Sequence, residues 1–145
     1  MIILIAHRGN FQGKNLNREN QEEYILEAAQ QGFDVEIDVW WFQGSFWLGH
    51  DEPQYKTTLN FLENPKFWCH LKNIEAVQQL MNIESLHWFW HETDKITITN
   101  KGYIWTYPGV FLENSIINQP PNVAKLKSTG MKILGICADD FTGII

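Results

Sequence analysis

Residues 34–38 read Asp-Val-Glu-Ile-Asp, a stretch in which acidic and apolar side chains alternate. A β-strand turns successive side chains to opposite faces, so Asp34, Glu36 and Asp38 share one face while Val35 and Ile37 fill the other. Carboxylates two residues apart stand about 7 Å apart along a strand, near enough to converge on one hard divalent cation. The same pattern is also typical of an edge strand with a solvated acidic face, and both interpretations stay open here.

A histidine ends the first apolar stretch of the chain. Residues 2–6 are too short for a membrane span and lack the basic start of a signal peptide, so they predict a buried strand that ends in His7, Arg8 and Gly9. In parallel α/β folds, ligands bind at the carboxyl ends of strands, and Gly9 lets the backbone turn away there. A polar strand exit with a surface arginine is the alternative interpretation.

A second histidine follows a second apolar stretch. Residues 46–48 are expected to pair back on residues 39–42 through a turn at 43–45, which contains Gly44. His50 would then stand at a strand end beside Asp51. The pattern thus repeats the arrangement of His7 and brings a second imidazole to the same end of the sheet.

Taken together and in order, these motifs resemble the glycerophosphodiester phosphodiesterases of the phosphatidylinositol phospholipase C-like superfamily. The resemblance is strong over about the first third of the chain, and its motifs are His7-Arg8-Gly9, Glu19-Asn20, Glu36-x-Asp38 and His50-Asp51. It implies a TIM-type barrel and a metal-dependent hydrolase that cleaves glycerophosphodiesters to glycerol 3-phosphate and an alcohol. A lyase that stops at a cyclic phosphate is the closest alternative.

The resemblance also assigns roles to the motif residues. His7 and His50 would exchange a proton as general acid and base, and Arg8 would hold the phosphate. Glu36 and Asp38 would hold the divalent metal, magnesium or calcium in this family. Glu19 would support Arg8. The chemistry asks for the same groups, because a poor alkoxide leaving group needs a cation on the phosphoryl oxygens and a proton donor.

One expected metal ligand is altered. The family usually carries Glu-x-Lys at a strand end, whereas residues 67–72 of this chain end in His70-Leu71-Lys72. His70 and Lys72 would share the inward face, with Cys69 and Leu71 facing outward. Lys72 suits a phosphate contact. An imidazole is a ligand typical of zinc or manganese, so these metals join magnesium and calcium as candidates. A core histidine with a backbone partner is the alternative for His70.

The net charge and the number of cysteines limit the possible binding partners and the expected cellular compartment. The net charge of −6 argues against nucleic acid, for which a basic face is expected, and leaves phosphate binding to local cations. The only two cysteines, Cys69 and Cys137, lie far apart, and the sequence shows no signal peptide or membrane span. We expect reduced thiols in a cytoplasmic protein that acts on a small soluble phosphodiester.

The rest of the chain keeps the rhythm of an α/β protein. A capping-box spacing from Asn20 to Glu23 predicts a helix over residues 20–31 ended by Gly32. The remaining expected elements are a helix at 73–82 capped by Asn73, single helical turns at 58–62 and 123–127, and strands at 67–72, 87–91, 104–107, 115–118 and 131–137. A regular (β/α)8 barrel needs about 200 to 250 residues, so 145 residues predict one trimmed barrel domain, residues 1–145, with seven or eight strands and reduced helices.

Aromatic side chains gather in the later predicted strands. Tryptophans on strands can stack on sugar rings, so a non-catalytic ligand- or carbohydrate-binding barrel is a second class of function, although core packing is the more usual role of such residues. His91 and Trp105 would line the mouth of the barrel. The aromatic residues, 14% of the chain, could instead cover sheet left bare by missing helices or form a homodimer contact.

Overall fold

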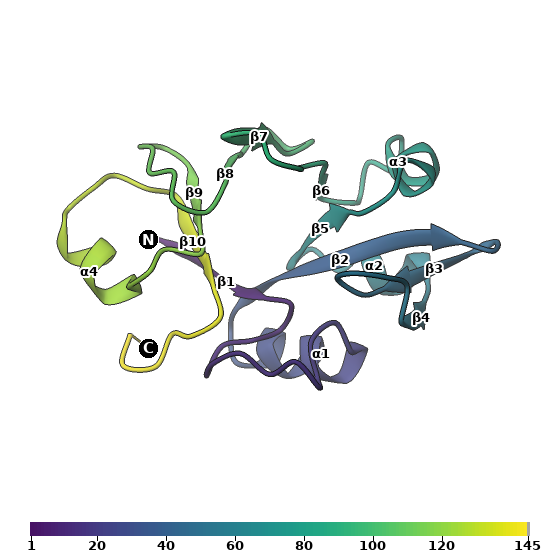
Figure 1. Cartoon of the computed structure of the whole chain (residues 1–145), viewed down its shortest axis with the longest axis horizontal. Helices are drawn as coiled ribbons and strands as arrows, with labels where there is room; N and C mark the ends of the chain where they lie inside the picture. Colours follow the sequence, from purple (N-terminus) through teal and green to yellow (C-terminus); the bar gives the residue numbers. More distant parts are fainter. Residues whose placement is uncertain (145) are drawn as a thin grey trace.

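The strands of the chain form one curled sheet, and short helices connect some of them (Figure 1). The computed structural model describes residues 1–144. Its strands are β1 Ile3–His7, β2 Asp34–Phe42, β3 Ser45–Leu48, β4 Tyr55–Thr57, β5 Phe67–Leu71, β6 Trp88–Phe89, β7 Ile96–Ile98, β8 Ile104–Thr106, β9 Ile116–Asn118 and β10 Gly135–Ala138. Its helices are α1 Glu22–Gln30, α2 Leu59–Leu62, α3 Ile74–Leu80 and α4 Val123–Ser128. No described helix is long and apolar enough to cross a membrane.

Parallel strands form the body of the sheet in the order β6-β5-β2-β1-β10-β9-β8. The antiparallel strands β3 and β4 extend β2 on one side, and β7 pairs with β8 on the other. Over residues 1–144 no strand pairing joins β6 to β8, so the sheet curls without a continuous ladder. Phe89 of β6 and Trp105 of β8 stack across this gap with ring centroids 4.6 Å apart.

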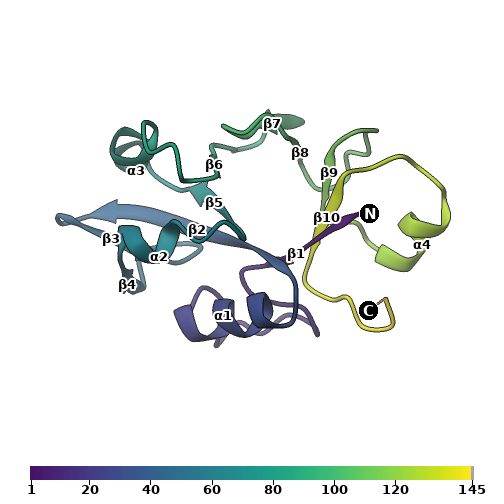
Figure 2. The same cartoon turned by 180° about the vertical axis from the view of Figure 1, so that it is seen from behind.

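The sheet has an apolar layer on each side. Inside the curl lie Ile5, Trp68, Phe89, Trp105, Ile116 and Cys137. A larger cluster fills the space between the sheet and the helices outside it. Figure 2 shows these helices from behind, placed around the outside of the curled sheet. Cys69 and Leu71 belong to this outer cluster, which confirms that His70 between them faces inward. Both cysteines are free and buried, one on each side of the sheet.

The helices start where polar side chains cap them, with one exception. Asn73 accepts a hydrogen bond from the Ala76 N–H, which confirms its predicted role as the cap of α3. The predicted capping box at α1 is wrong, because the N-cap residue of α1 is Gln21, one residue later than Asn20, and Gln21 makes no side-chain cap. Asn20 is unavailable as a cap since its amide binds Asp38 on β2.

Two strands are shorter than predicted because the neighbouring strands with which they pair are short. The last strand begins at Gly135 rather than at Met131, since Gly135 aligns with Ile3 and Ile116, the first residues of the neighbouring strands β1 and β9. Likewise, β6 covers only two of the residues predicted at 87–91, the two that pair with β5. Residues 131–134 therefore lie outside the strand, although Leu134 still exchanges backbone hydrogen bonds with Ile3 and Ser115.

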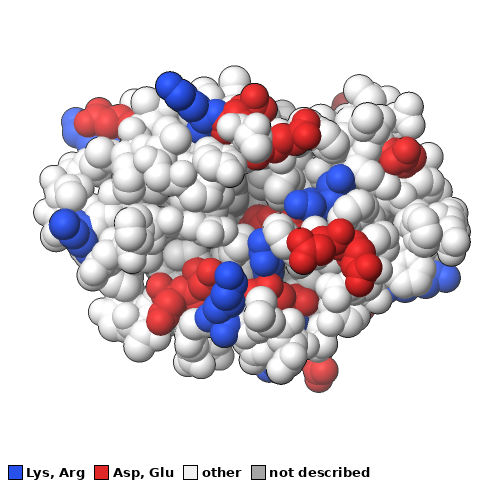
Figure 3. Space-filling model, in the orientation of Figure 1, with Lys and Arg blue, Asp and Glu red and all other residues white. Residues whose placement is uncertain are grey.

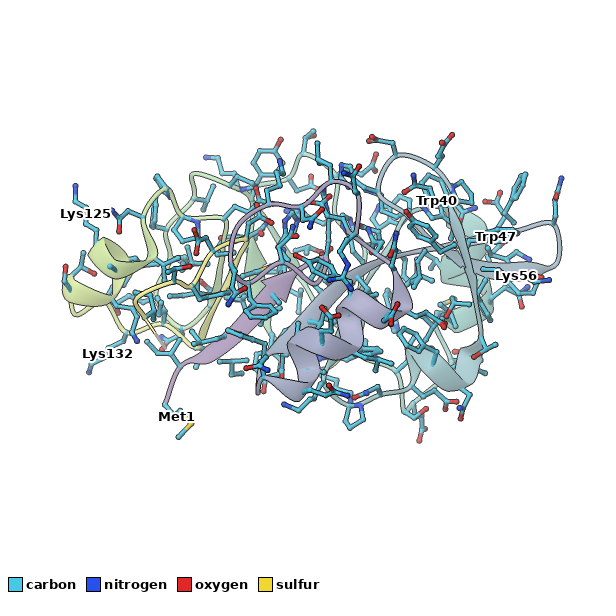
Figure 4. The ribbon with its side chains drawn as sticks, turned by 90° about the horizontal axis from the view of Figure 1, so that it is seen from below. Met1, Trp40, Trp47, Lys56, Lys125 and Lys132 are labelled. Carbon is cyan, nitrogen blue, oxygen red and sulfur yellow. The ribbon has the colours of Figure 1, made fainter. Side chains whose placement is uncertain are left out.

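The β2–β3 hairpin extends beyond the curled sheet and confirms the predicted pairing of residues 39–42 with residues 46–48. Trp40 pairs with Trp47, and Trp47 pairs with Lys56 of β4. Figure 4 shows these three side chains together at one end of the molecule, far from Lys125 and Lys132 at the other. Trp40 is two residues beyond Asp38, so this row starts next to the acidic face of β2.

Acid is expected to destabilise the fold partly through His87. Its Nε2 lies 2.8 Å from Thr99 Oγ1, and its ring centroid lies 4.1 Å from that of Trp68. Burial and the charge of Lys101 lower the pKa of His87 to about 4. Between pH 6.5 and 4 the unfolded chain therefore binds a proton that the folded chain does not, and stability falls as the pH falls.

From pH 7 to pH 5 we expect the free energy of unfolding to fall by about 1 to 2 kcal/mol more in the wild type than in His87→Gln. Urea titrations of both proteins at the two pH values measure this difference. An equal fall in the two proteins would contradict the prediction.

Candidate active site

The two central carboxylates of residues 34–38 are buried inside the curl. Glu36 is 2% exposed and Asp38 is 1% exposed. Their strand, β2, lies between β1 and β5, with Glu36 next to His7 and Asp38 next to His70. The interpretation as an edge strand with a solvated acidic face is therefore wrong. Two buried carboxylates need positive charge beside them, and the surrounding side chains supply it.

His70 faces both carboxylates with one ring nitrogen. Its Nδ1 lies 3.6 Å from Glu36 Oε2 and 3.4 Å from Asp38 Oδ1, while Nε2 lies 2.9 Å from the carbonyl oxygen of His91. Because a carbonyl only accepts, Nε2 carries the proton and Nδ1 is directed at the carboxylates. Burial lowers the pKa of His70, but the hydrogen bonds and charges of Asp38 and Glu36 outweigh it and raise the pKa to about 9.

Glu36, Asp38 and His70 together could hold a metal ion. One ligand atom from each lies within 4.8 Å of the other two. The backbone partner at Nε2, together with the Phe89 ring stacked 4.9 Å away, fixes the imidazole so that Nδ1 remains for a metal. Two carboxylates and one imidazole are a donor set that zinc and manganese accept readily. The backbone partner predicted by the alternative interpretation thus exists, but it occupies only Nε2, and Nδ1 faces the two carboxylates.

Arg8 connects the first and second motifs to the carboxylates. Its guanidinium donates from Nη1 to Glu19 at 3.1 Å and from Nη2 to His50 Nε2 at 3.1 Å, and Nε lies 3.5 Å from Asp38. The backbone of Arg8 is left-handed, with φ of 58°, and its N–H binds the carbonyl oxygen of Glu36 at 2.8 Å. This strained conformation is held by the site around it.

His7 is oriented by an acid that the sequence analysis missed. Asp139, directly after β10, lies 2.8 Å from His7 Nδ1 and also accepts from Asn10. Burial lowers the pKa of His7, but the hydrogen bond that its Nδ1 donates to Asp139 and the charge of Glu36 raise it above its ordinary value. The position of Asp139 after an apolar run was a usable signal, the same one that marks His7 and His50. His7 Nε2 faces the Gln119 side chain at 2.9 Å and Glu36 at 3.9 Å.

Asn20 holds Asp38 in place. Its side chain donates to Asp38 Oδ2 at 2.9 Å and accepts from the Asp38 N–H at 3.0 Å. Burial raises the pKa of Asp38, yet the nearby imidazoles of His50 and His70 hold it well below its ordinary range. Asp38 therefore stays ionised. The asparagine of the Glu19-Asn20 motif is thus a positioning residue that the sequence analysis treated only as a helix cap.

His50 is more exposed than His7, Arg8 and His70, with 41% of its side chain accessible. Its Nδ1 lies 3.6 Å from Asp38 Oδ2. The turn that delivers it needs Gly49, because a side chain there would collide with the carbonyl oxygen of Glu52. Trp40 donates from its indole to the carbonyl oxygen of Gly49 at 2.6 Å and so holds the turn against the hairpin.

A cavity of about 120 Å³ opens between these side chains. The predicted residues that line it are His7, Arg8, Glu36, Asp38, His50, His70, His91 and Trp105, and they are joined by Glu92, Tyr107, Pro108, Asn118 and Gln119. Glu19 and Lys72 do not line it: Glu19 is behind Arg8, and the charge of Lys72 helps to lower the pKa of Asp38. Acidic and basic side chains gather around a hollow near the centre of this face (Figure 3).

The aromatic side chains inside the curl pack mainly as core. Trp105 is 2% exposed and is stacked on Phe89. A ligand could therefore contact only the small part of Trp105 that lines the cavity. Four larger hollows, of about 540, 500, 300 and 270 Å³, lie elsewhere, and no histidine lines them. Chemistry rather than size therefore identifies the cavity at His7 as the candidate active site. The chain matches no protein-family model, no curated protein and no solved structure.

Proposed function

We propose that this chain is a metal-dependent phosphodiesterase that cleaves glycerophosphodiesters, a short relative of the glycerophosphodiester phosphodiesterases with a reduced TIM-type barrel. One observation supports it most: six residues predicted from separate motifs line a single small cavity, although they come from positions as far apart as 7 and 70. They are His7, Arg8, Glu36, Asp38, His50 and His70.

The phosphate would lie over the carboxylate pair. A divalent cation held by Glu36, Asp38 and His70 would supply positive charge to the phosphoryl oxygens and so stabilise the transition state. Arg8 is already oriented by Glu19, and its guanidinium would hold a phosphate oxygen on the side of His50. In an acidic chain this local positive charge is what attracts an anionic substrate.

Two imidazoles would move the protons. His7 stands beside Glu36, and His50 stands beside Asp38, so each carboxylate has one of these two histidines next to it in addition to His70. One ring would accept the proton of the attacking hydroxyl, and the other would give a proton to the leaving alkoxide. Asp139 fixes the His7 ring for this task, as a carboxylate behind a catalytic histidine does.

The products depend on the nucleophile. Attack by water breaks the bond between phosphorus and the alcohol oxygen and gives glycerol 3-phosphate and the free alcohol. Attack by a neighbouring hydroxyl of the substrate gives a cyclic phosphate first, which water then opens. A lyase would release the cyclic phosphate, and a non-catalytic barrel would bind the diester without cleaving it.

The test is an assay of the chelator-treated chain with glycerophosphocholine, followed by ³¹P NMR. We expect turnover to glycerol 3-phosphate only after addition of magnesium, calcium, manganese or zinc. A cyclic phosphate that accumulates as the end product would make the chain a lyase. Binding without turnover under every metal would favour the non-catalytic alternative. If the chain showed no binding and no turnover, the proposal would be overturned.

Asp139→Asn is expected to lower kcat by about 10²-fold with little change in KM, because it disturbs the orientation and basicity of His7 without touching the phosphate. Steady-state kinetics and a melting curve of the variant measure this. Asp140→Asn, next in the chain but bonded only to Thr142, is the matched control and should keep kcat. A KM effect without a kcat effect would contradict the positioning role of Asp139.

A further inference from the structure

Buried polar atoms without a partner gather at the candidate active site. Among residues 1–144, such side-chain atoms belong to Arg8, His50, Trp88, His91 and Asn118. All of these residues except Trp88 line the cavity. Buried nitrogen and oxygen atoms are normally hydrogen-bonded, so exceptions that share one cavity indicate a ligand that completes them.

The phosphate and the cation account for only half of this set. Arg8 Nε and His50 Nδ1 lie 3.5 and 3.6 Å from Asp38, where the anionic substrate and the metal would sit. His91 and Asn118 lie elsewhere: His91 follows β6, and Asn118 ends β9. With β8 between them, those strands form the part of the curl opposite β1 and β2 (Figure 1). Their unpaired atoms need a different partner.

The chemistry of this second wall suits hydroxyl groups. His91 is 8% exposed, and both of its ring nitrogens lack a partner, so a neutral ring offers one donor and one acceptor. Asn118 adds an unpaired carbonyl oxygen. A hydroxyl both donates and accepts, whereas an ammonium group only donates. The atoms are closed off from bulk water in this structure, so the side chains must turn to meet a group in the cavity.

Size limits what can enter. A water molecule occupies about 30 Å³ of liquid, so a cavity of about 120 Å³ holds little more than a short chain beside the phosphate. Trp105 and Tyr107 give this wall a carbon surface against which such a chain can pack. The second alcohol of a diester must therefore project outward, on the open side near His50.

We infer that His91 and Asn118 form a hydroxyl-recognising subsite, which holds the short polyol half of the substrate inside the cavity while the other alcohol stays outside. This inference takes the identity of the substrate from the proposed function, but its test measures binding and does not require turnover. It makes the two residues determinants of specificity rather than of the chemical step. It also explains why polar groups are kept buried without partners at a cost to stability.

The test compares glycerol 3-phosphate with n-propyl phosphate, which has the same carbon chain and no hydroxyls. Calorimetry in manganese is expected to show that the wild type binds glycerol 3-phosphate about 10- to 100-fold more tightly. His91→Phe and Asn118→Leu should each reduce this preference about 10-fold and leave the affinity for n-propyl phosphate unchanged. His91→Gln, which keeps a donor and an acceptor, should retain part of it.

Melting curves separate recognition from a structural role. Because the wild-type atoms are unpaired, His91→Phe and Asn118→Leu should not lower the melting temperature, whereas a structural role predicts that they do. Asn17→Leu, at an exposed position, is the control for Asn118→Leu. Equal affinity of the wild type for the two phosphates, or no binding of either, overturns the inference. A clear preference without phosphodiesterase turnover would support the subsite and refute the proposed function.

Discussion

Replacing His7 by alanine is expected to lower kcat for phosphodiester cleavage by about 10³-fold, because general acid–base catalysis by a positioned imidazole contributes about 10² to 10⁴. His7 is buried, is held by Asp139 at 2.8 Å and is directed at the cavity beside Glu36. The loss should appear in kcat more than in KM, since the ring takes part in proton transfer rather than in binding the ground state. Steady-state kinetics with glycerophosphocholine measure it.

The double variant sharpens this test. If His7 and His50 act as a pair, His7→Ala/His50→Ala should cost little more than either single substitution, because residues that act as a unit are not additive. His87→Gln is the matched control, since His87 is buried against Trp68 and Tyr103 and does not line the cavity. Activity that survives the loss of both His7 and His50 would refute the proposed mechanism.

Loss of the metal site is the second large effect, and it can be measured without turnover. At a manganese concentration 100 times Kd, binding adds about 2.7 kcal/mol to the stability of the folded chain. For a chain of this size that corresponds to a rise in melting temperature of roughly 5 to 10 °C. Glu36→Gln keeps the shape of the side chain but removes a charged ligand, so we expect it to abolish most of this rise.

Calorimetry with magnesium, calcium, manganese and zinc then identifies the preferred ion. His70→Ala should weaken manganese and zinc more than magnesium and calcium, since an imidazole is a poor ligand for the latter two. Glu113→Gln, at an exposed position, is the control for the loss of one negative charge. If manganese did not raise the melting temperature of the wild type, or raised that of Glu36→Gln equally, Glu36, Asp38 and His70 would not form a metal site.

The sequence predicted the local elements well where a short-range signal exists. The hairpin from β2 to β3, the Asn73 cap of α3 and the inward side of β5 all follow from turn residues, capping and strand alternation. It predicted the end of the last strand to within one residue, Cys137 instead of Ala138, but placed its start four residues early, because a strand begins only where a partner begins. The Asn20 cap failed for a related reason: Asp38, distant in sequence, competes for the same amide.

The candidate site divides in the same way. The sequence by itself determined which catalytic and metal-binding residue types are present and at which strand ends they lie, since strand alternation and motif order are local properties. Only the tertiary structure decided that Asp139 orients His7, that Asn20 holds Asp38 and that Glu36 and Asp38 are buried. These are contacts between residues 18 to 132 positions apart, and they depend on how the sheet curls. Side-chain pairing across a curled sheet is set by the packing of the whole chain, which no short stretch of sequence encodes.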